Sequence, residues 1–339
     1  MVAWGVNLIA LTRLRTWMAA QGYERFFVQQ PENFAWLTGG GDNTVLTLRP
    51  VAAWLEVTPQ TVRLHSSRIE ARRLREEEVG GLEVVPYPWY APPKAEGPSD
   101  QEHDLTPLRL VLSPEEQDRY RTLGRDAAQA LGESLRFADP EWSEFELAGA
   151  IAEELWSRGI QPVVLLVAGE ERLFRHRHPI PKEARLGRLF MGVVCGRRHG
   201  LIANLTRLRS FGHPQAQTLN ARVCRVEARA LAASRPGASL GEVLAEIQAG
   251  YQELGCPEEF ENHHQGGLTG YRSREVLAAP GEATRLQVGM ALAWNPSLPG
   301  AKVEDTFLLG EDGLENLTFD PAWPMEEVEG RLRPRVYEG

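Results

Sequence analysis

The first hundred residues combine a helical and a strand-like pattern of apolar positions. Apolar side chains recur at the spacing of one helix face, at Leu8, Leu11, Leu14, Trp17 and Met18. This pattern predicts a helix over 8–21, with Gly22 as its stop signal. The apolar runs at 26–28, 44–48 and 52–57 are typical of buried strands. We therefore expect a small α/β unit at the start of the chain.

A stretch without apolar periodicity, 86–107, follows this unit and is rich in proline and polar residues. Such a composition fits a linker or a surface excursion between domains. The chain has 339 residues, which is long for a single core, so two domains are expected. We place them at 1–108 and 109–339. A capping-box pattern at Ser113 predicts that a helix follows it and runs to about Leu135.

The second domain contains an internal echo. Ser143 and Ser239 are each followed three residues later by a glutamate, Glu146 and Glu242, and each pair opens a helix of similar length. The first helix leads into Pro162 and a strand-like run, and the second leads into Pro257 and the motif NHHQGGLTGYRSRE. We expect the two halves of a duplicated α/β domain, with a functional site at the junction between them.

Composition and charge narrow the range of partners. The net charge is −9 and no basic stripe with interleaved aromatic residues occurs, so nucleic acid is not an expected partner. No window reaches the roughly 18 to 20 apolar residues of a membrane span, so we expect a cytoplasmic protein without a membrane partner. The three cysteines, Cys195, Cys224 and Cys256, are widely spaced, which indicates reduced thiols and no structural zinc site. Cys195 is interpreted as a packed side chain rather than a nucleophile.

A set of ordered motifs carries a family resemblance across nearly the whole chain. PENFAWLTGG opens the set, and five motifs follow it in the second domain, at 168–181, 193–212, 262–275, 288–296 and 301–309. Together they resemble the creatinase, prolidase, aminopeptidase P and methionine aminopeptidase superfamily, which has the pita-bread fold. The resemblance implies a mixed α/β protein with an N-terminal creatinase-like domain, a pita-bread domain and a homodimeric assembly.

The peptidases of this superfamily hold two divalent metals with two Asp, one His and two Glu, because such cations need anionic oxygen ligands. Most of these ligands are missing here. Valine stands at the first Asp position, as Val194 or, in an alternative alignment, as Val193. Asn204 replaces the second Asp and Asn295 replaces the first Glu, so Glu304 is the only carboxylate that matches. We therefore expect no metal and no other cofactor.

The motif NHHQGGLTGYRSRE decides the histidine ligand, and two alignments are open. The first places Gly267 at the metal-binding histidine and Arg274 at the family's second histidine. The second makes His264 the ligand, which leaves room for a single weakly held metal on His264 and Glu304. We favour the first, because it preserves the acidic residue that ends the motif and an upstream histidine, His263.

The superfamily also contains a precedent for catalysis without metal. Creatinase uses a histidine as acid and base to split a C–N bond of a small guanidino compound. The resemblance implies that His178 has this role, with His176 as its neighbour and Glu304 as the group that orients the base or binds a substrate cation. The substrate contacts that it implies are His263, His264, Arg274, Asn204, Asn295 and Thr206.

Each of these residues also has a purely structural interpretation. The loop histidines are then surface residues with ordinary partners. Arg274 forms an ion pair with Glu275 or Glu304, and Asn204 and Asn295 hydrogen-bond to each other and to Thr206 in the vacated site. Because both interpretations fit the sequence, the two remain open at this level.

Three functional hypotheses follow. The first is a metal-independent hydrolase of a small amide, amidine or peptide-like C–N substrate. The second is a catalytically inactive pseudopeptidase that binds peptide or protein through the cleft. The third is a conventional metal-dependent Xaa-Pro dipeptidase or aminopeptidase, which the missing ligands disfavour.

Overall fold

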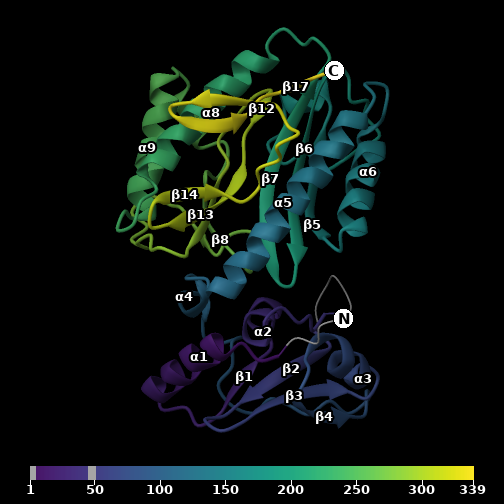
Figure 1. Ribbon diagram of the computed structural model, residues 1–339, viewed down its shortest axis with the longest axis vertical. Coiled ribbons are helices and arrows are strands. Elements are labelled where there is room, and N and C mark those ends of the chain that lie inside the picture. The colour runs from purple at the N-terminus through teal and green to yellow at the C-terminus, as the bar shows by residue number, and fades with distance from the viewer. Residues whose placement is uncertain (1–4, 45–50) are drawn as a thin grey trace. The chain divides into compact units, whose positions relative to one another are not determined.

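The computed structural model describes residues 5–44 and 51–339 (Figure 1). Most of the strand expected at 44–48 lies outside these residues. Across the described ranges, no helix combines the length and the apolar character needed to cross a membrane.

The chain forms two compact units that interleave slightly in sequence. The first consists of Met1–Glu116 and the short segment His199–Leu201. The second consists of Gln117–Arg198 and Ile202–Gly339. The division after Glu116 falls inside a long helix.

The first unit contains one mixed sheet and short helices. Its elements are α1 (Leu8–Gln21), β1 (Phe26–Val28), α2 (Pro31–Thr38), β2 (Ala53–Val57), β3 (Val62–Ser67), α3 (Ala71–Arg73), a π-helical turn (Leu74–Glu78), β4 (Glu83–Tyr87) and α4 (Thr106–Arg109). The strand order is β1-β2-β3-β4; β3 and β4 are parallel, and the other neighbours are antiparallel. The expected α/β unit is confirmed.

Helix α1 has the predicted bounds because both of its ends are capped. The Asn7 side-chain oxygen accepts hydrogen bonds from the backbone N–H groups of Ile9 and Ala10. Gly22 ends the helix in the left-handed conformation, at φ 74°, which costs glycine little.

The prediction that 86–107 is a linker is wrong for its second half. Ser99 bridges to Phe27 of β1. The buried carboxylate of Asp100 accepts hydrogen bonds from two backbone N–H groups just before α2 and from the side chain of Asn33. The segment is therefore part of the first unit, and its polar composition reflects buried hydrogen bonding rather than solvent exposure.

The second unit is larger and contains two main sheets. Its elements are α5 (Pro114–Phe137), α6 (Glu144–Ser157), β5 (Gln161–Ala168), α7 (Glu170–Leu173), β6 (Leu189–Arg198), β7 (Leu201–Ser210), α8 (Ala216–Ala233), α9 (Leu240–Glu253), a 3-10 helix (Pro257–Phe260), β8 (Gly266–Thr269), β9 (Val276–Leu277), β10 (Ala291–Trp294), β11 (Ser297–Leu298), β12 (Ala301–Lys302), β13 (Asp305–Gly310), β14 (Gly313–Asn316), β15 (Met325–Val328), β16 (Arg331–Pro334) and β17 (Tyr337–Glu338). Helix α5 and strand β7 each begin with residues grouped with the first unit.

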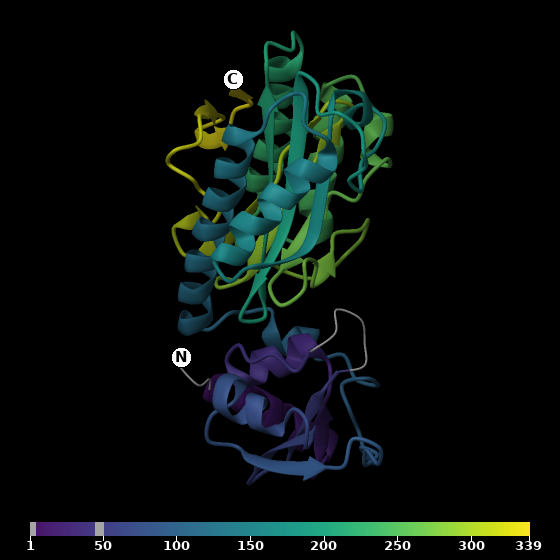
Figure 2. The same ribbon diagram turned by 90° about the vertical axis from the view of Figure 1, so that its right-hand side faces the viewer.

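Backbone contacts join the two sheets of the second unit. The first sheet has the order β17-β7-β6-β5, and the second has the order β14-β13-β10-β8-β9. Helices α5 and α6 cover one face of the first sheet (Figure 2), where Gly192 of β6 allows side chains of both helices to approach the strand. Thr206 of β7 bridges to Glu304, the residue before β13, and its N–H donates to the Glu304 carbonyl at 3.0 Å.

The internal sequence repeat corresponds to the same helix cap at the start of α6 and of α9. Ser143 and Ser239 each form a complete capping box at the start of α6 and α9. Each serine also forms an isolated antiparallel bridge, Ser143 to Arg185 and Ser239 to Arg285. The two halves of the second unit therefore start their second helix and tie it to a later segment in the same way.

Candidate active site

A small pocket of about 100 Å³ lies in the second unit where the two sheets approach each other. Strands β5 and β6 supply an apolar wall, consisting of Val164, Leu166, Val193 and Cys195. The other lining residues are polar and come from loops and from β12: His178, His264, Ser273, Arg274, Asn295, Lys302 and Glu304.

The pleat of β6 decides which valine faces this pocket. Side chains alternate along a strand, and Val193 and Cys195 line the pocket, so Val194 points to the opposite face. Val193 pairs with Leu166 of β5, so the wall is apolar across both strands. The alternative position, Val193, is therefore the one at the site. Burial raises the pKa of the Cys195 thiol to about 12, as expected of a packed side chain.

The only carboxylate in the lining, Glu304, is fully engaged by cations. Its Oε1 accepts from Nη2 of Arg274 at 2.7 Å, and its Oε2 lies 3.1 Å from Nζ of Lys302. The hydroxyl of Thr206 donates to Oε2 at 3.3 Å. Burial alone would raise the pKa of Glu304, but the charges of Lys302 and Arg274 outweigh it and lower the pKa to about 2. Glu304 is therefore ionised at neutral pH.

The predicted ion pair between Arg274 and Glu304 is confirmed, whereas Lys302 was missed. Its sequence signal was the spacing within AKVED, because residues two apart on an extended chain share a face. Two cations against one carboxylate leave this trio with a formal charge of +1. The pocket therefore favours anions and electron-rich oxygens.

The predicted hydrogen bond between Asn204 and Asn295 is wrong. The Asn204 side-chain nitrogen donates to Thr269 Oγ1 at 2.8 Å, and Asn204 does not line the pocket. The side-chain oxygens of both asparagines are buried without a hydrogen-bond partner among the described residues. Strand β8, through Thr269, holds Asn204 away from Asn295, so only Asn295 offers its amide to the pocket.

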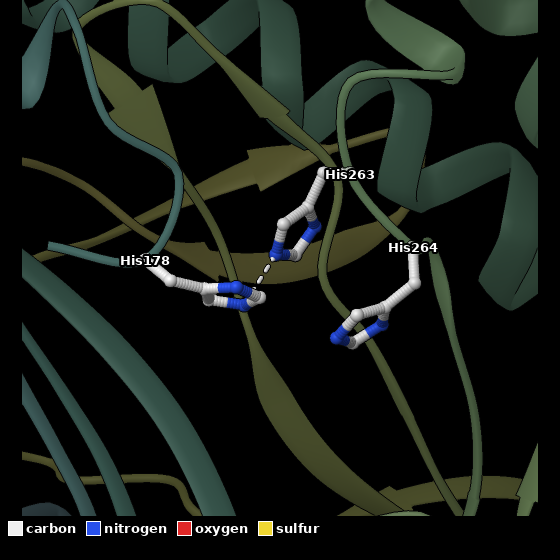
Figure 3. A group of neighbouring side chains, drawn as sticks. All are labelled: His178, His263 and His264. Carbon is white, nitrogen blue, oxygen red and sulfur yellow. Dashed lines mark hydrogen bonds between the residues drawn. The ribbon is translucent and has the colours of Figure 1, made fainter.

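Three histidines form a cluster beside the pocket (Figure 3). His178 Nε2 and His263 Nε2 lie 3.0 Å apart, and the His264 ring stacks on the ring of His263 with centroids 4.5 Å apart. Burial, helped by the charge of Lys302, lowers the pKa of His178 and lowers that of His263 to about 2. Burial and then Arg274 lower the pKa of His264 to about 4. All three imidazoles are therefore neutral at neutral pH.

The two loop histidines proposed as catalytic are separated by the structure. His178 lines the pocket, whereas His176 is exposed and is not among the lining residues. The backbone N–H of His176 donates to the carbonyl oxygen of Arg172, which keeps this part of the loop close to α7. The structure therefore leaves His178, and not its neighbour, beside the other site residues.

Position 267 cannot carry a side chain in this backbone. Gly267 has φ 152° and lies between β9 and β10 in the second sheet. A Cβ atom added there would lie 2.1 Å from the carbonyl oxygen of Val276, a distance that real contacts do not reach. Arg274 lines the pocket as the first alignment of NHHQGGLTGYRSRE requires. In that alignment glycine replaces the metal-binding histidine.

Two family models match this chain. The family model described as "Metallopeptidase family M24" matches residues 118–311, more than half of the chain. The chain belongs to metallopeptidase family M24. The model described as "Creatinase/Prolidase N-terminal domain" matches residues 11–123. The expected superfamily is confirmed, and so is the combination of a creatinase-like domain with a pita-bread domain.

Curated relatives of this M24 protein are distant. A probable dipeptidase PepE of Mycobacterium tuberculosis is 26% identical over 227 residues, which cover 64% of this chain and 60% of that protein. An uncharacterised peptidase of Staphylococcus saprophyticus is 22% identical over 234 residues, or 65% of each chain. The chain thus matches about 60% of the length of the first of these relatives.

Solved structures share the fold at low identity. Prolidase from Pyrococcus furiosus superposes with a TM-score of 0.75 at 19% identity, over 90% of this chain and 99% of that one. The N-terminal domain of FACT complex subunit SPT16 from chickpea superposes with a TM-score of 0.66 at 11% identity, over 92% and 96% of the two chains. Identities this low show the fold alone.

The donor set of this pocket does not fit the two-metal centre that the family name implies. Two hard or borderline dications need several anionic oxygens. The lining offers one carboxylate, Glu304, and both of its oxygens already face cations. In the first alignment the other family positions carry Val193, Asn204, Gly267 and Asn295, none of which supplies an anionic ligand. The second alignment adds only the neutral imidazole of His264.

Proposed function

We propose that this M24 protein hydrolyses a small amide, amidine or peptide-like C–N bond without the two-metal centre of its family. The observation that carries the proposal is the trio of Glu304, Arg274 and Lys302. In this trio the charge of two side chains takes the place of the charge that the metals supply in the family's peptidases.

Electrostatics support the metal-free part of this proposal. Two dications would add a charge of about +4 to a region that already holds an excess of one positive charge and little solvent. Glu304 is 2% exposed and could not bind metal without taking the carboxylate from the buried Lys302 and the largely buried Arg274. Such a buried, unpaired cation costs several kcal/mol, on the order of 3–5.

The histidine pair supplies a base for the proposed reaction. If Nε2 of His178 donates to Nε2 of His263, the other ring nitrogen of His178, Nδ1, is free to take a proton from water. His263 then orients the base, as the third member of a catalytic triad does. Lys302 and Arg274 face the region where negative charge develops on the substrate oxygen, and the apolar wall limits competing water.

A catalytically inactive peptide-binding protein is the second candidate. The observation that favours it is that the charged trio is complete without a substrate, so the pocket is stable as it stands. Resemblance to prolidases and to PepE favours a third candidate, a metal-dependent Xaa-Pro peptidase, which the donor set opposes.

The deciding experiment is an assay panel on protein treated with a chelator. Small amides, amidines, creatine-like guanidines and dipeptides are tested with and without added Mn²⁺. The proposal predicts turnover that resists chelation and falls more than about 100-fold in His178→Ala. His176→Ala, two residues away and outside the pocket, is the matched control and retains activity.

Each alternative gives a different result in this panel. Cleavage of Xaa-Pro dipeptides that requires Mn²⁺, together with two equivalents of bound metal, rejects the proposal in favour of the conventional peptidase. Absence of turnover with saturable peptide binding that Arg274→Ala removes rejects it in favour of the binding protein.

A further inference from the structure

The histidine cluster beside the pocket has a geometry of its own, independent of the family's ligand positions. His178 comes from the loop between α7 and β6, whereas His263 and His264 precede β8. Figure 3 shows the three rings directed towards a common space. One ring nitrogen of each lies within 4.8 Å of those of the other two.

The segment that carries two of the rings is held in place by buried hydrogen bonds. Gln265 donates through its side-chain nitrogen to the carbonyl oxygens of Phe260 and His263, at 2.9 and 2.6 Å. Tyr251 of α9 donates in turn to the side-chain oxygen of Gln265 at 3.2 Å. Because this backbone is fixed, the consecutive residues His263 and His264 present both rings on the same side.

We propose that His178, His263 and His264 form a binding site for one divalent transition-metal ion of the Zn²⁺ class. Neutral imidazole nitrogen is a preferred donor for such ions, and three histidines with an open fourth position make a complete ligand set. In the first alignment of NHHQGGLTGYRSRE, this site uses none of the positions that hold metals in M24 peptidases.

The distances require only local movement. Zn–N bonds of about 2.0–2.1 Å in a tetrahedron place the ligand nitrogens about 3.3–3.4 Å apart. His178 and His263 are already 3.0 Å apart through Nε2, and the widest separation in the cluster is below 4.8 Å. His178 is exposed on its loop and His264 is half-buried, so both rings can close around an ion held by the buried His263.

Metal binding requires a change of tautomer in the pair His178 and His263. Their hydrogen bond requires a proton on one of the two Nε2 atoms. In the metal-bound form each ring is neutral with its proton on Nδ1. The Nδ1 atoms of His263 and His264 have no protein hydrogen-bond partner among the described residues, so the protein does not fix the tautomer. Missing outer partners weaken metal sites by about 10–100-fold each, so we expect micromolar rather than nanomolar affinity.

The surrounding charges select the type of ion and its fourth ligand. Lys302 and Arg274 oppose a dication, and Glu304 offsets one of these charges. The same two cations favour an anion, such as hydroxide or chloride, at the fourth position. Hard ions that need carboxylates, such as Mn²⁺ and Mg²⁺, find only imidazole donors in the cluster, so they are excluded.

The consequence for the proposed hydrolase is inhibition, because a bound ion uses the ring of His178 that serves as base. This consequence depends on the proposed function, whereas metal binding does not. The two are tested separately, since binding is measured on the metal and the protein alone.

The test is a titration of chelator-treated, full-length protein with Zn²⁺ by calorimetry and with Co²⁺ by visible absorption. We expect one ion per chain with micromolar affinity, and a tetrahedral Co²⁺ spectrum. His264→Gln should weaken Zn²⁺ binding by at least about tenfold, because it removes one of three ligands. His176→Gln is the matched control, an exposed histidine two residues from His178 that lies outside the cluster, and should bind as the unmodified protein does.

Several outcomes would overturn the proposal. These are no saturable Zn²⁺ binding, equal affinity in His264→Gln and the unmodified protein, or Mn²⁺ binding tighter than Zn²⁺. Circular dichroism and thermal unfolding of each variant show that it is folded. If His264→Gln is not folded, His178→Gln replaces it, since His178 is exposed and its loss costs little packing.

Discussion

The two halves of the second unit have similar frameworks and contribute opposite chemistry to the pocket. The half with α6 contributes a wall of valine, leucine and cysteine from β5 and β6, and one imidazole, that of His178. The half with α9 contributes a histidine, both cations and the carboxylate. Similar caps and bridges thus position the pocket, while the residues on the strands and loops decide what the pocket can bind.

The largest expected effect tests the charged side of this comparison. Glu304→Ala leaves Arg274 and Lys302 buried without their carboxylate, so unfolding free energy should fall by about 3–5 kcal/mol. Glu315→Ala breaks an exposed ion pair with Arg121 and should cost less than about 1 kcal/mol. Urea unfolding followed by fluorescence measures both. A cost below 1 kcal/mol for Glu304→Ala would show that the trio contributes little to stability.

The carboxylate of Glu304 should also make the free energy of unfolding depend on pH. Its folded-state pKa of about 2 lies below the ordinary value of 4.5, so the stabilisation is complete above pH 4.5 and is lost as the pH falls towards 2. At pH 3 the loss relative to neutral pH should be about 2 kcal/mol. Glu304→Gln lacks this component, so stability curves of the two proteins should converge on acidification. Parallel curves would contradict the assignment.

The packing of α5 and α6 on β6 should be sensitive to the size of the side chain at position 192. A Cβ atom on Gly192 of β6 would lie 2.8 Å from Leu131 and 3.2 Å from Ile151. Gly192→Ala should therefore cost about 1–3 kcal/mol. Gly149→Ala in α6, where nothing lies within 4 Å, should stabilise the protein by up to about 1 kcal/mol. Thermal unfolding distinguishes them, and equal shifts would show that β6 can adjust.

The smallest effect tests whether the two frameworks are equivalent. Ser143→Ala and Ser239→Ala each remove the side chain of a capping box and should each cost about 1 kcal/mol. Denaturant titrations should give values that agree within about 0.5 kcal/mol. A clear difference would mean that one half depends on its helix cap more than the other does.

Local signals in the sequence predicted the parts of the fold that depend on local chemistry. Asn7 and Gly22 fix the ends of α1, and the serine-glutamate pairs fix the starts of α6 and α9. These features depend on residues a few positions apart, so a pattern reveals them. The segment around Asp100 was misjudged because its partners lie about 70 positions earlier, and its polar residues resemble those of an exposed linker.

The family motifs predicted which residues lie at the site. They did not predict which hydrogen-bond and ion-pair partners those residues have. The ion pair between Arg274 and Glu304 followed from charge, but the second cation, Lys302, was overlooked despite its spacing. The hydrogen bond from Asn204 to Thr269 depends on how β8 lies beside β7. No short sequence pattern encodes that arrangement. The histidine cluster combines a loop and a distant motif, so only three-dimensional structure reveals it.

The backbone at Gly267 limits which substitutions the site can accept. This backbone, at φ 152° with a carbonyl oxygen 2.1 Å from any added Cβ, excludes every other amino acid unless the strands beside it move. Single substitutions could place carboxylates in the pocket, but a histidine at position 267 requires the strands beside it to move. In the first alignment, a two-metal centre of the M24 type would therefore need a rearranged β8 as well as new carboxylates.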